Sequence, residues 1–280
     1  MYKKIPTYKD NKWDYKEFET KEDFTNFILT LFKEPGQYQF DETALLFNEQ
    51  AKIFNKQGFY CNKPFRSKDY IKYWNFEKEK CKEGVLYYGE KNIFYLTRDY
   101  YMWLNFLPIF DKEEKKYGFA KVRDAQYHMA LYELLAELHH RHVAILKKRQ
   151  IASSYFHMAK VLNQFWFEEG SICKIGASLK DYINDKGSWK FLEEYKTFLN
   201  EHTAWYRPTN PAKVLLWEQK IEVRINNRKT HKGLMSKIQG ASFEKNPTTG
   251  VGGPCTYFFH EEAGIAPKMD QTFEYIRPAM

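Results

Sequence analysis

The first 84 residues repeat apolar side chains at the three- and four-residue intervals of an α-helix. Residues 20–34 begin with a threonine and an aspartate in the spacing of a capping box. Further helical patterns over residues 41–58 and 67–84 each end in glycine, which closes helices readily. We therefore predict a separate helical N-terminal region over residues 1–84. The apolar face of its first helix comprises Phe24, Phe27, Ile28 and Leu31.

Beyond residue 84, short apolar runs that predict strands alternate with longer helical patterns. The predicted elements are two strands within 85–96, a helix over 123–141 with Asp124 as N-cap, a strand over 142–147, a helix over 154–170, a strand over 171–178, a helix over 179–202 broken at Gly187, and strands over 215–225, 233–243 and 255–264. Strands that alternate with helices form crossover connections in a largely parallel sheet. The predicted fold is therefore α/β, with helices flanking a mostly parallel sheet in residues 85–280.

The composition indicates a packed, positively charged chain. Hydrophobic residues make up 43% and aromatic residues 18% of the sequence, which argues against disorder. The formal net charge of +8 favours polyanionic partners without identifying one. The four cysteines are far apart and form no C-x-x-C pair, so we expect reduced thiols and a cytosolic protein. No apolar run has membrane-spanning length, so we expect no membrane partner.

A candidate phosphate-binding loop, KKRQIASS, lies between the strand predicted at 142–147 and the helix that follows. Laid over the pattern G-x-x-x-x-G-K-[ST], Lys147 and Ala152 take the two glycine positions. Ser153 stands in place of the lysine, and Ser154 supplies the hydroxyl for Mg²⁺. Because a helix start offers backbone N–H groups to phosphates, the loop predicts a nucleotide site. The alternative is an ordinary strand–turn–helix corner with a serine cap.

Adjacent carboxylates, Glu261 and Glu262, follow the apolar run TYFFH at the end of the last predicted strand. In a nucleotide site one carboxylate would hold the Mg²⁺ shell, and the next would orient or deprotonate water. The alternative is an exposed Glu–Glu pair in a turn. We expect His260, directly before the pair, to pack or to support the site rather than to bind a ligand.

With these motifs in this order, residues 94–280 resemble the ATPase domain of viral large terminases, the DNA-packaging motors of tailed phages. The segment FYLTRDYYMWLNFLPI looks like the lead-in segment of one terminase group. Gln126 matches the glutamine with which the family reads adenine, and a side-chain amide pairs with the donor and acceptor edge of that base. KKRQIASS is similar to the terminase phosphate loop, which in some members carries its lysine at the front.

The resemblance implies a role for the loop residues and for the acidic pair. Lys147 is the first choice for the phosphate lysine, with Lys148 as the alternative, and Arg149 matches the loop arginine of the family. Glu261 stands where the Mg²⁺-shell aspartate is usual, and Glu262 matches the catalytic glutamate. The residues expected to bind nucleotide are Gln126, Lys147, Lys148, Arg149, Gln150, Ala152, Ser153 and Ser154; those expected to hold the metal are Ser154 and Glu261; those expected to act in catalysis are Lys147, Arg149 and Glu262.

The resemblance further implies ATP and Mg²⁺ as cofactors, and double-stranded DNA, a portal protein and a small terminase subunit as partners. It implies a homo-oligomeric ring that acts in the host cell cytoplasm during phage assembly, with a P-loop-type sheet. Two features depart from the family: the loop lacks glycine and the late lysine, and Val251 replaces an arginine that many terminases carry. Arg224 and Arg228 are candidates to act in a neighbouring subunit instead. Because the sequence ends soon after Glu262, we expect an N-terminal part of a longer protein, without the nuclease domain.

A basic turn, RINNRKTHKG, is the predicted contact to the DNA backbone. Its Arg224, Arg228, Lys229 and Lys232 supply the charge that phosphate binding needs without base readout. A solvated hairpin tip is the competing interpretation. Two rival functions stay open from the sequence: a nucleotide-, DNA- or portal-binding module without turnover, and a helicase-type ATPase that would need a second motor domain.

Overall fold

The structure is a computed structural model, and the chain folds into two compact units. The first unit comprises Met1–Phe156 with His202–Ala204, and the second comprises His157–Glu201 with Trp205–Met280. The structure describes residues 1–32, 40–111, 114–147, 151–184, 187–207, 209–225, 228–244, 253–265 and 269–276.

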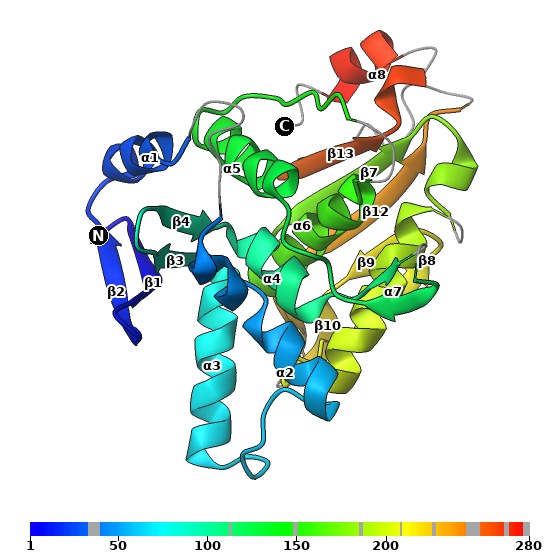
Figure 1. The fold of residues 1–280 in the computed structure, drawn as a ribbon. Helices are drawn as coiled ribbons and strands as arrows, with labels where there is room; N and C mark the ends of the chain where they lie inside the picture. Colours follow the sequence, from blue (N-terminus) through cyan, green and yellow to red (C-terminus); the bar gives the residue numbers. More distant parts are fainter. Residues whose placement is uncertain are drawn as a thin grey trace. The chain divides into compact units, whose positions relative to one another are not determined.

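A four-stranded sheet organises the first unit, in the order β2-β1-β3-β4 (Figure 1). Strand β1 (Lys3–Lys9) pairs antiparallel with β2 (Lys12–Phe18) and parallel with β3 (Val85–Tyr88). Strand β4 (Ile93–Leu96) pairs antiparallel with β3, as predicted for the two strands within 85–96. This sheet joins segments from both sides of Gly84.

Strands β1 and β2 were not predicted, and they replace the helical structure expected at the start of the chain. Their connection is a tight turn in which Asp10 and Asn11 have φ of +50° and +59°. Two successive residues with positive φ characterise the type I′ turn, whose twist matches that of a hairpin. The signal in the sequence was therefore the Asp–Asn pair between two runs that mix lysines with aromatic residues.

The helices predicted over 20–34, 67–84 and 123–141 are confirmed, with small shifts at their ends. The single helix predicted over 41–58 is instead divided into a 3₁₀ helix, Glu42–Leu46, and a separate α-helix, Glu49–Gln57. Thr20 forms a capping box with Asp23 before the first helix, and Gly58 and Gly84 close the next two with φ of +79°. The helix predicted from 123 begins at Asp124, so Arg123 and not Asp124 is its N-cap residue. The elements are α1 (Lys21–Thr30), η1 (Glu42–Leu46), α2 (Glu49–Gln57), α3 (Lys68–Glu83), α4 (Arg98–Phe106), the short strands β5 (Ile109–Asp111) and β6 (Lys116–Gly118), and α5 (Asp124–Leu138).

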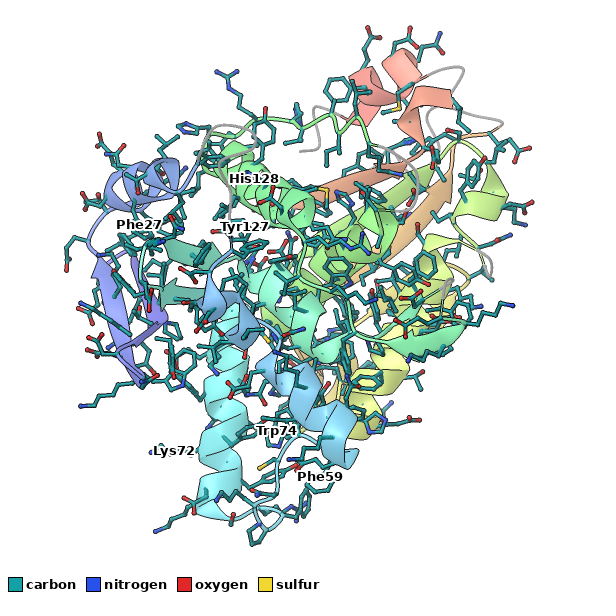
Figure 2. All side chains as sticks on the ribbon, viewed as in Figure 1. Phe27, Phe59, Lys72, Trp74, Tyr127 and His128 are labelled. Carbon is teal, nitrogen blue, oxygen red and sulfur yellow. The ribbon has the colours of Figure 1, made fainter. Side chains whose placement is uncertain are left out.

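Helix α5 is joined to the first sheet by an aromatic core. Tyr127, labelled on α5 in Figure 2, accepts a hydrogen bond of 3.2 Å from the backbone N–H of Tyr95 in β4. Its ring lies edge-on to Phe94, 6.2 Å between centroids. Because both strand residues are almost fully buried, this contact fixes how the start of α5 sits on the sheet.

The strand predicted over 142–147 is wrong. Residues 141–147 form neither strand nor helix, and Leu146 is fully exposed. A short apolar run becomes a strand only where a neighbouring strand completes its hydrogen bonds. The sequence shows the run, but not whether a partner strand is present.

A five-stranded mixed sheet organises the second unit, in the order β13-β7-β12-β9-β8. Strand β7 (Ile172–Ala177) lies between β13 (Tyr257–Glu261) and β12 (Lys237–Ser242) and is parallel to both, as the side-by-side arrows in Figure 1 show. β9 (Leu216–Glu218) and β8 (Asn210–Lys213) extend the sheet antiparallel. The prediction of a mostly parallel sheet is therefore correct for three strands and wrong for the other two.

The run predicted as one strand over 215–225 is divided between two sheets. Its first part is β9 of the main sheet, and its second part is β10 (Ile221–Ile225). Strand β10 pairs with β11 (Arg228–Lys232) in a separate two-stranded hairpin that contains the predicted basic turn.

Helices of the second unit largely match the prediction. Gly187 is required before α7, because a Cβ at this position would collide with the carbonyl oxygen of Tyr182. None of the helices in the described parts of the chain combines the length and apolar character that a membrane crossing requires. The elements are α6 (Ser153–Phe167), whose first four residues belong to the first unit, η2 (Lys180–Tyr182), α7 (Ser188–His202), η3 (Ala263–Ile265) and α8 (Met269–Ile276).

Candidate functional site

Ala152 has the backbone conformation of a glycine. Its φ is +55°, in the left-handed region that glycine occupies without cost and that costs other residues about 1–2 kcal/mol. Its carbonyl oxygen accepts the N–H of Phe156 at 3.1 Å, so Ala152 caps the start of α6. This is the position at which the phosphate-loop pattern places its second glycine.

The two serines at the start of α6 differ in exposure. Ser153 is buried, with its hydroxyl 4.0 Å from the sulfur of Met129 in α5, whereas Ser154 is partly exposed. The first turn of a helix carries backbone N–H groups without helical partners, which attract anions. A hydroxyl beside such a turn is the ligand that the loop pattern assigns to Mg²⁺.

Gln126 from α5 contacts the loop, 25 residues away in sequence. Its Nε2 donates a hydrogen bond of 2.9 Å to the carbonyl oxygen of Ile151. The side chain is 4% exposed, and its buried Oε1 has no hydrogen-bond partner among the residues that the structure describes. A buried amide oxygen without a partner costs free energy unless a donor completes it. An exocyclic amino group of a base is a donor of that kind.

Of the four remaining loop residues with an expected role, the structure describes one. Lys147, the first residue of the loop, is exposed and lies in neither a helix nor a strand. Lys148, Arg149 and Gln150 lie outside the described residues, so the roles expected for them stay predictions. Val251 also lies outside them.

Glu261 and Glu262 have opposite environments at the carboxyl end of β13. Glu261 is the last residue of the strand, 6% exposed, and its Oε2 accepts a hydrogen bond of 3.0 Å from Ser188 Oγ. Glu262 is exposed, has φ of +50°, and its backbone carbonyl accepts a hydrogen bond of 3.3 Å from Ser178 Oγ. The alternative of an exposed acidic pair therefore fails for Glu261.

His260 packs, as expected. Its ring stacks on Phe243 at 5.6 Å between centroids, and burial lowers the pKa of His260 below the ordinary value for histidine. A lowered pKa keeps the imidazole neutral at pH 7.

Helix α6 runs antiparallel to β13 within the second unit. The ring of His157 stacks on Phe259 at 4.3 Å between centroids, and the Nζ of Lys160 lies 5.2 Å from the ring centroid of Tyr257. Residue numbers therefore rise along the helix as they fall along the strand. A parallel strand followed by an antiparallel helix is the arrangement of crossover α/β units.

The hairpin of β10 and β11 divides its four basic residues between two faces. Arg224 pairs directly with Lys229, so these two share one face, while Arg228 and Lys232 lie on the other. Lys229 Nζ is 3.0 Å from a carboxylate oxygen of Glu222 on the same face. No acidic residue lies on the Arg228 and Lys232 face within the described part of this hairpin.

Across the described ranges, no group of three or more His, Cys, Asp or Glu side chains is placed to hold a metal ion. Mg²⁺ in nucleotide sites takes one or two protein ligands together with phosphates and water. The hydroxyl of Ser154 and the carboxylate of Glu261 are oxygen donors of the kind that this ion binds. None of the four cysteines, all within the described ranges, forms a disulfide bond, and three of them are buried.

A scan against protein-family models finds no family that matches this chain, and a search of curated proteins finds no similar sequence.

Two residues that the sequence did not single out, Ser178 and Ser188, contact the acidic pair. Each stands at the end of an element, Ser178 directly after β7 and Ser188 at the start of α7. A serine that follows a strand or begins a helix is common, so neither position was distinctive without the fold.

Proposed function

We propose that the chain is the ATPase part of a viral large terminase and hydrolyses ATP to drive double-stranded DNA into a procapsid. The observation that carries the proposal is the glycine-like φ of Ala152, directly before the helix start that the phosphate-loop pattern requires. An ordinary helix corner with a serine cap has no need of this backbone conformation. The proposal includes a P-loop-type sheet, ATP and Mg²⁺.

The loop and Gln126 bind the nucleotide in this proposal. The N–H groups at the start of α6 and the amine of Lys147 contact the phosphates, which are anions suited to a helix start. The buried Oε1 of Gln126 accepts a hydrogen bond from the adenine amino group. Because its Nε2 already donates to Ile151, the amide connects base recognition to the loop backbone.

Ser154, Glu261 and Glu262 perform the metal and water steps. Ser154 and Glu261 would hold Mg²⁺, which would supply positive charge beside the phosphates, and Glu262 would orient the attacking water and accept its proton. Within the second unit, α6 packs along β13, the strand that ends in the acidic pair, and this contact supports the proposal.

The test is Mg²⁺-dependent binding of a fluorescent ATP analogue to the full chain and to Lys147→Ala. We expect the parent to bind and the variant to lose most of its affinity, because the lysine charge faces the phosphates. Lys12→Ala, which removes an exposed lysine of β2, is the matched control and should bind like the parent. If the parent does not bind the ATP analogue, the proposed nucleotide site is wrong. Binding without turnover would favour the alternative, a catalytically degenerate nucleotide-, DNA- or portal-binding module.

DNA contact is assigned to the hairpin of β10 and β11. The exposed Arg228 and Lys232 offer two positive charges on one face, and the duplex backbone is a dense polyanion. The opposite face is a poorer candidate, because the Glu222 carboxylate offsets its charge. A portal protein, a small terminase subunit and a homo-oligomeric ring belong to the same proposal.

A further inference from the structure

We propose that Ser178 and Ser188, the serine pair, position Glu261 and Glu262 for Mg²⁺ and water. This inference rests on the proposed ATPase function and adds two residues to its machinery. Neither serine touches substrate in this assignment. Each acts through the glutamate to which its hydroxyl donates a hydrogen bond.

Ser188 controls the side chain of Glu261. Both residues are almost fully buried, and their hydrogen bond is 3.0 Å long. Ser188 is the first residue of α7, so the carboxylate also lies at the end of the helix where the macrodipole is positive. A Mg²⁺ shell requires a carboxylate held in a fixed orientation, and the hydrogen bond from Ser188 fixes that of Glu261.

Ser178 controls the backbone of Glu262. A φ of +50° is unfavourable for a glutamate, and residues held in such conformations cluster at functional sites. Ser178 Oγ donates to the carbonyl oxygen of Glu262 at 3.3 Å and supports this conformation. The side chain of Glu262 is exposed, whereas that of Glu261 is buried.

Both serines lie on the connection that leaves the neighbouring strand. Ala177, the last residue of β7, pairs with Glu261, the last residue of β13, so the two strands end together. Gly187 allows a close approach to Tyr182 that no side chain would permit, and α7 begins directly after it. The chain thus leaves β7 at Ser178 and returns at Ser188 to the edge of the sheet where β7 and β13 end.

The experiment is a Mg²⁺ titration of ATP-analogue binding and of ATP turnover on the full chain. Ser188→Ala should raise the Mg²⁺ concentration at half-saturation about tenfold, which is the lower end of the effect of lost outer-shell partners. Ser188→Thr keeps the hydroxyl and should restore most of the affinity. Ser178→Ala should lower turnover while leaving the Mg²⁺ half-saturation within about twofold of the parent, because it loosens only the Glu262 backbone.

Two buried serines of the same unit provide matched controls. Ser171 Oγ donates to the Gln164 carbonyl at 3.1 Å, and Ser236 Oγ donates to the Glu168 carbonyl at 3.0 Å. Alanine at either position removes a comparable hydroxyl away from the acidic pair, so the Mg²⁺ half-saturation should not move. The free energy of unfolding, measured for every variant, separates positioning from lost stability.

Each outcome decides one of two questions. If Ser188→Ala has the same Mg²⁺ half-saturation as the control variants, the positioning role of the serine pair is wrong. The proposed ATPase function is not affected by that result. The same holds if Ser178→Ala turns over ATP at the parent rate, a result that is available even where Ser188→Ala fails to fold. A parent that neither binds nor hydrolyses ATP at any Mg²⁺ concentration overturns the proposed function itself, and the serine pair with it.

Discussion

At the scale of single residues, Ala152 shows how a motif without glycine keeps the geometry of one. Alanine has the smallest side chain for which a left-handed backbone conformation is unfavourable. Ala152, with φ of +55°, adopts this conformation, in which glycine would be unstrained. The loop is therefore strained at the point where the backbone must turn into α6. Strain of this kind persists only where the surrounding structure maintains it.

Removing that strain should stabilise the protein. Ala152→Gly is expected to raise the free energy of unfolding by up to about 1 kcal/mol, because relief of the left-handed penalty outweighs the added freedom of the unfolded chain. Chemical denaturation of parent and variant measures the difference. Ala136→Gly, inside α5, is the control of opposite sign and should cost about 1 kcal/mol. Equal destabilisation by both substitutions would show that Ala152 is not left-handed in solution.

Glu262 is the residue whose loss should separate binding from chemistry. Glu262→Gln keeps the size and polarity of the exposed side chain but removes its ability to accept a proton from water. ATP turnover should fall at least a hundredfold while the affinity for the ATP analogue stays within about twofold of the parent. Steady-state hydrolysis and analogue binding give the two values. Glu169→Gln, on an exposed residue of the second unit, should change neither, and hydrolysis that survives in Glu262→Gln rules out the assigned role.

At the scale of elements, the hairpin shows what strand register adds to a run of charges. Arg224, Arg228, Lys229 and Lys232 are neighbours in sequence, yet pairing of β10 with β11 sends two to each face. One face is partly neutralised by Glu222, and the other is not. The face with Arg228 and Lys232 is therefore the candidate DNA-binding face. The face with Arg224 and Lys229 provides a control with the same number of basic residues.

Charge removal on the two faces should have unequal effects on duplex binding. The double variant Arg228→Ala, Lys232→Ala is expected to weaken binding and to reduce the slope of log affinity against log salt by about 2, one phosphate contact per residue. The double variant Arg224→Ala, Lys229→Ala removes the same charge and should change the slope by less than half as much. Binding of a duplex at several salt concentrations measures both slopes. Equal slopes for the two variants would show that net charge, and not a face, determines binding.

At the scale of the whole molecule, α6 belongs to both units. Ser153–Phe156 are counted with the first unit, and His157–Phe167 with the second, where the helix packs on β13. One helix therefore begins at the end of the candidate phosphate loop and continues along the chain into the second unit.

Local patterns in the sequence determined much of this protein. The capping box at Thr20, the closing glycines at 58 and 84, and the strands β3, β4, β7 and β13 were all predictable, because each depends on neighbours within a few residues. The same locality placed Glu261 at a strand end and Ala152 at a helix start.

Only the tertiary structure decided what depends on distant partners. Whether residues 142–147 form a strand, whether a sheet stays parallel at β9, and which face carries Arg228 are settled by pairing between segments far apart in sequence. The contacts of Gln126 with Ile151 and of Ser188 with Glu261 span 25 and 73 residues. The spacing of apolar residues in a segment shows which of its side chains are buried. It does not show which other segment covers them, and these contacts depend on that.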